Sequence, residues 1–278
     1  MRQSIGSQHA GYVRVLPVAA AIAIVAAGSV SAQEPTATDL AKTVQNPVGA
    51  IYNFPFQNNT TFGVGPADAT FNTLNIQPVI PTPLSSKILL INRAIIPVKY
   101  VGEAVEGQGT ASGLGDITIE LPFTAAAPGK VIWGIGPAFL LPTATDDRLG
   151  AGKWQAGLVG VILTMPGDWV IGALAQNTWS FAGDEVRADV NFFFSQYFLN
   201  YNLADGWYLT SSPIITANWE AESGEQWTVP VGGGFGKVQK FKIPVNFQIQ
   251  AFYNAVKPDA AGDWSLRLQI QPMIPIKR

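Results

Sequence analysis

The sequence contains no cysteine, and its single histidine is His9, in an N-terminal segment that we expect to be removed. The absence of cysteine excludes disulfide bridges and thiol chemistry, and zinc sites built from Cys and His are excluded with it. Enzymes that activate a nucleophile usually need histidine as the base. We therefore expect no catalytic residue, no bound metal and no cofactor.

Charge is also scarce, since charged residues make up 13% of the chain, about half of the usual share. The formal net charge is −2, and nucleic-acid binding requires a basic surface, so no nucleic-acid partner is expected. The chain instead has 28 glycines, 20 prolines and 11% aromatic residues. This composition disfavours a helical protein and favours many strands joined by turns.

Residues 1–32 have the pattern of a secretory signal peptide. Arg2 and Arg14 form a positive start, an apolar run covers Val15–Gly28, and small residues lead to a cleavage site after Ala32. The apolar run is shorter than the ~20 residues of a membrane-spanning helix. An exported chain without disulfides must be held together by its core, by closure of its sheet or by lipid.

Residues 33–49 are predicted to form a periplasmic segment with a short helix near Asp39–Gln45. Thr38 is the expected N-cap, and Pro47 would stop the helix. Beyond this segment, strand-like runs follow one another to the end of the chain, each bounded by Gly, Pro, Asp or Asn. The twelve predicted strands cover 50–64, 70–80, 87–99, 114–125, 130–141, 153–165, 168–181, 187–202, 206–218, 226–236, 239–254 and 263–276.

Connections between these strands alternate between longer, more acidic loops and short turns, which is typical of an up-and-down outer-membrane barrel. We therefore predict an all-β fold, with an antiparallel transmembrane β-barrel of about twelve strands over residues 50–278, in the bacterial outer membrane. An even strand number places both ends of the barrel on the short-turn side.

The last strand shows why lipid is the expected environment. In "DWSLRLQIQPMIPI", Leu266 and Leu268 alternate with Arg267 and Gln269, which predicts one face toward lipid and one toward a lumen. Runs of this length exceed the ~5–6 residues usual for soluble strands. Tryptophans near strand ends predict two aromatic girdles at the membrane interfaces, formed by Trp154, Trp169, Trp179, Trp207, Trp219, Trp227 and Trp264.

Strand parity also predicts which polar side chains line the lumen. The set is Asn75, Gln77, Arg93, Asp116, Glu120, Asp189, Asn191, Lys242, Asn246, Gln248, Gln250, Arg267, Gln269 and Gln271. Two interpretations remain open for it: a polar permeation path, or a hydrogen-bonded plug that fills a narrow barrel. Residues 33–49 could enter the lumen as a gate.

Three segments resemble a known family: Gln45–Pro66, Leu74–Leu84 and Arg93–Val98, which read "QNPVGAIYNFPFQNNTTFGVGP", "LNIQPVIPTPL" and "RAIIPV". They are similar to bacterial outer-membrane proteins described as putative transporters of the phenol-degradation (MetA-pathway) type, some of which carry the label "neuromedin U". The resemblance implies an exported barrel that passes small, hydrophobic or aromatic molecules. Its partners would be outer-membrane lipid, a small-molecule solute and the outer-membrane assembly machinery, which usually reads a terminal aromatic residue.

Two other classes stay open at this stage. One is a non-conducting structural or adhesion barrel, and the other is a secreted soluble β-protein that binds a hydrophobic ligand. Acidic clusters at Asp146–Asp147 and at Glu220, Glu222 and Glu225 lack the spacing of a calcium loop and are interpreted as solvated loops.

Overall fold

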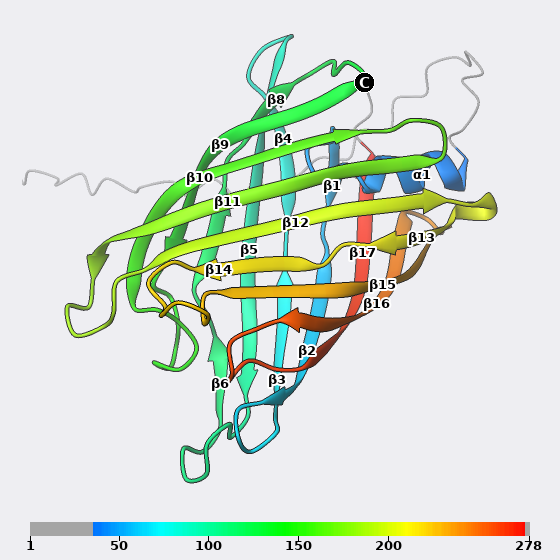
Figure 1. Cartoon of the computed structure of the whole chain (residues 1–278). Coiled ribbons are helices and arrows are strands. Elements are labelled where there is room, and N and C mark those ends of the chain that lie inside the picture. Colours follow the sequence, from blue (N-terminus) through cyan, green and yellow to red (C-terminus); the bar gives the residue numbers. More distant parts are fainter. Residues whose placement is uncertain (1–35, 276–278) are drawn as a thin grey trace, which may run out of the picture. The chain divides into compact units, whose positions relative to one another are not determined.

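The fold is a single antiparallel sheet that closes on itself, seen in a computed structural model that describes residues 36–275 (Figure 1). Residues 1–35 and 276–278 lie outside the described part, and the predicted signal peptide is therefore outside it. The wall consists of twelve antiparallel strands, which confirms the predicted fold class.

Several of the twelve wall strands are interrupted, so seventeen shorter strands are distinguished. The breaks fall at Phe54–Pro55, Gln77–Pro78, Gly115–Asp116, Leu121–Pro122 and Ser212–Pro213, and four of these contain proline, which has no N–H to donate to the ladder. The strands are β1 (Ile51–Asn53), β2 (Phe56–Val64), β3 (Ala69–Ile76), β4 (Val79–Pro83), β5 (Ile88–Val101), β6 (Ala111–Leu114), β7 (Ile117–Glu120), β8 (Phe123–Ala125), β9 (Val131–Leu141), β10 (Lys153–Thr164), β11 (Trp169–Gly183), β12 (Asn191–Asn202), β13 (Trp207–Ser211), β14 (Ile214–Asn218), β15 (Trp227–Lys240), β16 (Pro244–Val256) and β17 (Trp264–Pro275).

The barrel is closed by pairing between the first and last strands. Strand β17 pairs antiparallel with both β1 and β2, with Tyr52 opposite Ile274 and Asn59 opposite Arg267. Figure 1 shows the red β17 beside the blue β1 and β2. Closure gives every strand a neighbour on both sides. No unpaired backbone N–H or C=O group is therefore exposed along a strand edge to lipid, which cannot form hydrogen bonds with it.

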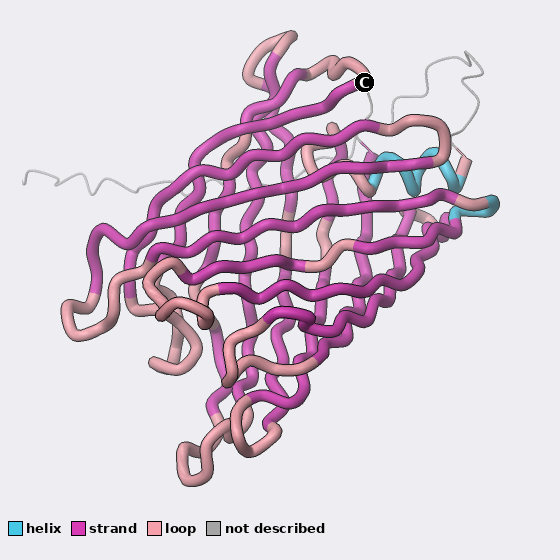
Figure 2. The backbone as a smooth tube through the Cα atoms, in the orientation of Figure 1, coloured by secondary structure: helices cyan, strands magenta, loops and turns pink. Residues whose placement is uncertain are grey.

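The two ends of the barrel differ in the length of their connections (Figure 2). At what we name the long-loop end, the connections are 65–68, 102–110, 142–152, 184–190, 219–226 and 257–263. At the short-turn end they are 84–87, 126–130, 165–168, 203–206 and 241–243. The alternation agrees with the sequence prediction.

Two connections between strands differ from the prediction by four residues or more. The turn expected between strands 226–236 and 239–254 is part of β15, which continues to Lys240, and the turn lies at 241–243. The polar residues Lys237 and Gln239 suggest a turn, but Val238 between them is buried, and the alternation of inward and outward side chains continues through it. Strand β12 begins at Asn191, and 187–190 belong to the preceding loop.

A short helix, α1 (Ala37–Val44), precedes the barrel, close to its predicted place. Its N-cap is Thr36, which forms a capping box with Asp39. The prediction of Thr38 as the N-cap is wrong, because its hydroxyl donates instead to the carbonyl oxygen of Leu203. No helix within residues 36–275 has the length and apolar character needed to cross a bilayer.

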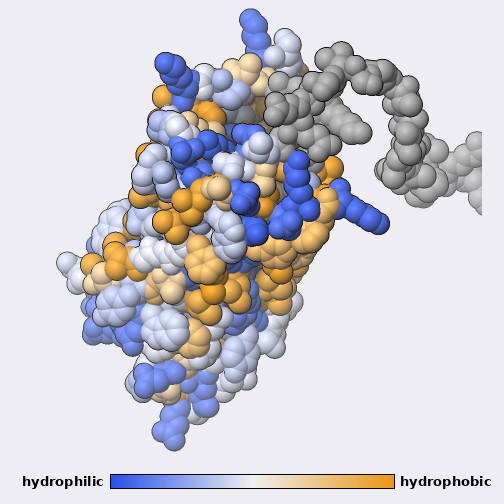
Figure 3. All heavy atoms as spheres, turned by 90° about the vertical axis from the view of Figure 1, so that its right-hand side faces the viewer, coloured by the Kyte–Doolittle hydropathy of each residue, from blue (hydrophilic) through white to orange (hydrophobic). Residues whose placement is uncertain are grey.

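The outer face of the wall is apolar. Leu158, Ile162, Leu209, Phe235 and Ile270 are each at least half exposed, and apolar side chains cover much of the face seen in Figure 3. The predicted girdle tryptophans Trp154, Trp169, Trp179, Trp207, Trp219, Trp227 and Trp264 are all exposed near strand ends, and Trp133, two residues inside β9, is exposed as well. Such a surface requires lipid around it.

Candidate functional site: the barrel interior

Two cavities lie in the interior formed by residues 36–275, and the larger of the two opens toward the long-loop end. Its volume is about 580 Å³, and Asn75, Lys99 and Asp116 line it together with Leu149 and Ala151 of the 142–152 loop. This loop folds into the mouth, where Leu149 is buried. Asp116 accepts hydrogen bonds from the backbone N–H groups of Ala144 and Ala151 at 3.2 and 2.7 Å. Lys99 donates to the carbonyl oxygen of Leu149 at 2.8 Å. These hydrogen bonds fix the position of the 142–152 loop at the rim of the larger cavity, which we name the outer cavity.

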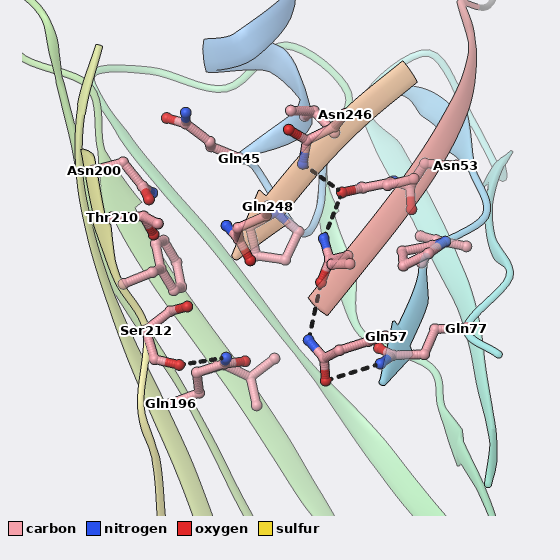
Figure 4. A pocket seen from close by; sticks show the side chains of 18 of the residues that line it. Gln45, Asn53, Gln57, Gln77, Gln196, Asn200, Thr210, Ser212, Asn246 and Gln248 are labelled. Carbon is pink, nitrogen blue, oxygen red and sulfur yellow. Dashed lines mark hydrogen bonds between the residues drawn. The ribbon is translucent and has the colours of Figure 1, made fainter. Parts of the chain in front are cut away.

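The inner cavity lies nearer the short-turn end and has a volume of about 150 Å³ (Figure 4). Carboxamide side chains dominate its lining: Gln45, Asn53, Gln57, Gln77, Gln196, Asn200, Asn246, Gln248, Gln269 and Gln271. Carboxamides donate and accept hydrogen bonds without carrying charge. The chamber therefore suits uncharged hydrogen-bonding groups.

The two cavities adjoin at four side chains that line both of them, and we name this level the waist: Gln57, Gln77, Arg93 and Gln196. Arg93 forms an ion pair with the buried Glu120, with 3.0 Å between Nη1 and Oε2. Its second terminal nitrogen donates to Oε1 of Gln77 at 2.6 Å. The only charges at the waist within the described residues are thus paired, and its other three side chains are amides.

One side of the interior is a continuous amide ladder. Gln57 donates to Gln269 at 2.9 Å, and Gln269 donates to Gln271 at 2.9 Å. Asn246 also donates to Gln271, at 3.2 Å, and accepts a hydrogen bond from the hydroxyl of Tyr208 at 2.8 Å. Figure 4 shows this chain of bonds along one wall. A ladder of this kind holds its side chains against the wall and keeps them from blocking the cavity.

The side formed by β11 and β12 combines apolar and amide side chains, because Gln176, Gln196 and Asn200 line the cavities beside its apolar residues. Phe192 and Phe194 line the outer cavity, and Phe198 and Leu174 line the inner one. These side chains come from β11 and β12, and Leu174 and Phe198 belong to a buried apolar cluster that extends along β9 and β10. Each cavity therefore offers apolar surface from β11 and β12 in addition to its amide groups.

The short-turn end of the inner cavity is closed by α1 and the residues after it. Val44, Gln45 and Pro47 line the cavity. Leu40, Ala41 and Val44 pack into a buried cluster with the barrel residues Ile51, Tyr208, Val238 and Met273. Lys42 donates to the carbonyl oxygen of Gly167 at 2.9 Å, and Gln45 and Asn202 exchange two hydrogen bonds at 3.0 and 3.1 Å. The helix is thus attached to two turns of the barrel.

Most of the predicted lumen residues lie on the inner face. Those that line a cavity are Asn75, Gln77, Arg93, Asp116, Glu120, Asn246, Gln248, Gln269 and Gln271. Gln250 and Arg267 are inward but fully enclosed: Arg267 donates to Asn59 at 2.8 Å and to the carbonyl oxygen of Ser212 at 2.7 Å. Gln250 bonds the backbone and hydroxyl of the same Ser212.

Three predicted lumen residues lie elsewhere. Lys242 is in the 241–243 turn, because β15 is longer than predicted. Asp189 precedes β12, is 81% exposed and pairs with Lys153 at 3.3 Å. Asn191 lies opposite the outward Trp179 and accepts a hydrogen bond from Asn177 at 3.0 Å. Parity misplaced Asn191 because "NFFFSQYF" has aromatic residues on both faces, and the phenylalanines at even positions face inward.

Sequence reasoning missed the tyrosine and the two glutamines that shape the inner cavity. Gln57 and Gln196 each reach the waist. Tyr208 packs over Gly236 of the neighbouring strand, where any Cβ would collide with the tyrosine ring. The glycine-rich run Val231–Lys237 is a usable signal, because glycine inside a strand often marks a place where another group packs closely.

Comparison with known proteins identifies the fold. No family model matches the chain, and no curated protein matches it. Among solved structures, an outer membrane channel from Pseudomonas putida F1 aligns with a TM-score of 0.63 at 17% identity, over 81% of this chain and 94% of that one. A NanC porin (TM-score 0.47, 9% identity, 81% and 100% coverage) and the CymD monoaromatic hydrocarbon channel (0.46, 10%, 87% and 91%) align too weakly to support an argument. The fold is that of an outer-membrane β-barrel.

Proposed function

We propose that the protein is a bacterial outer-membrane channel for the passive passage of small molecules, including hydrophobic or aromatic ones. The observation that carries this proposal is the pair of interior cavities that meet at the Arg93 waist. A solute would enter the outer cavity, pass between Gln57, Gln77 and Gln196, and reach the amide-lined chamber.

The mixed lining of apolar and amide side chains supports this class of solute. The phenylalanines of β12 offer an apolar surface, and the amide ladder offers hydrogen bonds to a polar substituent. Three buried polar atoms have no protein hydrogen-bond partner among the described residues: Oδ1 of Asn53, Oγ1 of Thr210 and Oε1 of Gln176. All three residues line a cavity, and buried polar atoms are seldom left unpaired, so they favour water or a solute with hydrogen-bonding groups.

We also propose that the chain belongs to the phenol-degradation-type transporters. The three segments that resemble this family carry Gln57, Gln77 and Arg93 of the waist, as well as Gln45 of the helix attachment. If this proposal is correct, the similarity in these segments reflects a waist with the same lining residues in both proteins. The long loops could then differ in sequence.

A second candidate function is a non-conducting barrel. It is favoured by the seating of α1 at the short-turn end and by the enclosed Arg267–Ser212–Gln250 network. In this case the interior polar groups would act only as a plug.

Single-channel recording of the detergent-purified mature protein in a planar bilayer distinguishes the two candidates. Reproducible conductance steps, altered by the double substitution Arg93→Met with Glu120→Gln, are expected for the channel. A folded barrel that stays silent, and that takes up no small aromatic compound in a liposome-swelling assay, would contradict the proposal.

A further inference from the structure

Lys237 is a cation on the outward, lipid-facing side of β15. Strand register aligns Trp207 with Lys237, Lys237 with Phe247, and Phe247 with Ile270, so these side chains form one row around the wall. The row lies close to the short-turn end, because β15 ends at Lys240. A charged side chain among aromatic and aliphatic neighbours in lipid requires a polar partner.

An apolar groove of about 460 Å³ lies beside this row on the outer wall. Its far side is formed by Phe235, Ile249 and Leu268, which the strand register aligns in a second row. The lipid-facing members of both rows are apolar except Lys237. The groove can therefore hold a hydrocarbon chain, with a single positive charge at one edge.

The Lys237 ammonium lies 4.8 Å from the centre of the Trp207 ring, and within residues 36–275 no carboxylate lies within ion-pair distance of it. Lys242 adds a second positive charge at this end of the wall. It lies in the exposed turn between Phe241 and Ile243, and the Phe241 ring is 6.5 Å from that of Phe247, which lines the groove. The groove thus runs from an apolar floor to a basic edge.

We propose that this groove binds an anionic phospholipid from the leaflet at the short-turn end. One acyl chain lies along Phe235, Ile249 and Leu268, and the phosphate meets the Lys237 ammonium beside the Trp207 ring. Lys242 favours a headgroup with net negative charge over a zwitterionic one, because a choline or ethanolamine cation would face it. The proposal depends on the lipid-facing wall and is independent of whether the interior conducts.

Native mass spectrometry of the full mature barrel, released from micelles with equal amounts of phosphatidylglycerol and phosphatidylcholine of identical acyl chains, tests the proposal. Wild type is expected to retain phosphatidylglycerol about fivefold over phosphatidylcholine. Lys237→Gln should bring this ratio close to one. Lys130→Gln is the matched control, because Lys130 lies in the 126–130 turn at the same end of the barrel, away from the groove; it should leave the ratio unchanged.

Phe235→Ala tests the groove itself and should lower retention of both lipids while the ratio stays high. Each variant is first checked for folding by its heat-dependent shift on an SDS gel. Equal retention of the two lipids by wild type would overturn the proposal. An equal loss of preference in Lys237→Gln and Lys130→Gln would overturn it as well, because it would indicate only a general attraction of anionic lipid to the lysines at the short-turn end.

Discussion

Arg93 and Arg267 face the same lumen, but their surroundings are different. Arg93 is paired with Glu120 at the waist, and both cavities reach it. Arg267 is enclosed, with only neutral acceptors at Asn59 and Ser212, and its guanidinium lies 5.0 Å from the centre of the Phe252 ring. Parity alone assigns both to the inner face, and it cannot distinguish a pathway residue from an enclosed one.

Arg93→Met should destabilise the barrel by about 3–5 kcal/mol, because Glu120 would remain buried without its cation. The double variant with Glu120→Gln should recover most of this loss. Urea unfolding followed by tryptophan fluorescence in detergent measures both. If the single variant were as stable as wild type, the ion pair would have no structural role and the waist would be more hydrated than its burial indicates.

Arg267→Glu should also destabilise the barrel strongly. The carboxylate of the introduced glutamate would face the oxygen atoms of Asn59 and Ser212, which accept hydrogen bonds from Arg267 in the wild type. Lys242→Glu, with the same change of charge in an exposed turn, should alter the unfolding free energy by no more than about 0.5 kcal/mol. Comparing the two urea midpoints is the measurement. Similar midpoints would mean that Arg267 is accessible to solvent.

At the scale of elements, α1 is the part whose position the sequence indicated least. Its apolar residues Leu40, Ala41 and Val44 could cover any apolar surface, and the contacts that fix it are distant in sequence, such as Gln45 with Asn202. Strand β12 is a similar case, because aromatic residues on both faces remove the parity signal. In strands with clean alternation, such as β16 and β17, the inward and outward faces were predicted correctly, although β16 begins five residues later than predicted.

Deletion of residues 36–46 should raise the single-channel conductance, because Val44 and Gln45 would no longer line the short-turn end of the inner cavity. The wall should stay folded, since β1 begins only at Ile51. Planar-bilayer recording of the deletion variant beside wild type is the test. An unchanged conductance would mean that solute does not pass α1.

The helix cap predicts a dependence on pH. Hydrogen bonds from Thr36 hold the pKa of Asp39 below its usual range. A lowered folded-state pKa means that the cap contributes fully above the ordinary carboxyl pKa and is lost as the pH falls through the lower, folded value. Conductance that depends on release of α1 should therefore increase in strong acid, and Asp39→Asn should show the higher conductance already at neutral pH. Identical acid responses in both proteins would contradict this.

At the scale of the whole molecule, the wall could be predicted because its physics is repeated in strand after strand. Alternation, strand length and loop length each report on the same membrane environment, and errors of a few residues at one boundary leave the count of strands intact. The interior could not be predicted to the same depth, since its contacts join residues such as Gln57 and Gln269, which lie far apart in sequence.

Leu268→Arg, near the middle of β17 and 46% exposed on the outer face, should lower the unfolding free energy by about 2–4 kcal/mol in lipid vesicles. Val256→Arg, at the last residue of β16, should cost about 0–1 kcal/mol. Equal costs at the two positions would show that the outer face does not meet a bilayer of graded polarity.

The closing seam between β17 and the pair β1 and β2 sets the order of assembly. Every other wall strand can pair with a strand that is adjacent in sequence. Arg267 and Asn59 must come together although almost the whole sequence of the barrel lies between them. Until they do, β2 and β17 are bare edges that can join the strands of another chain. The barrel is therefore most vulnerable to aggregation at its last step, and a variant that slows only this seam would fail during biogenesis even if its finished fold were as stable as wild type.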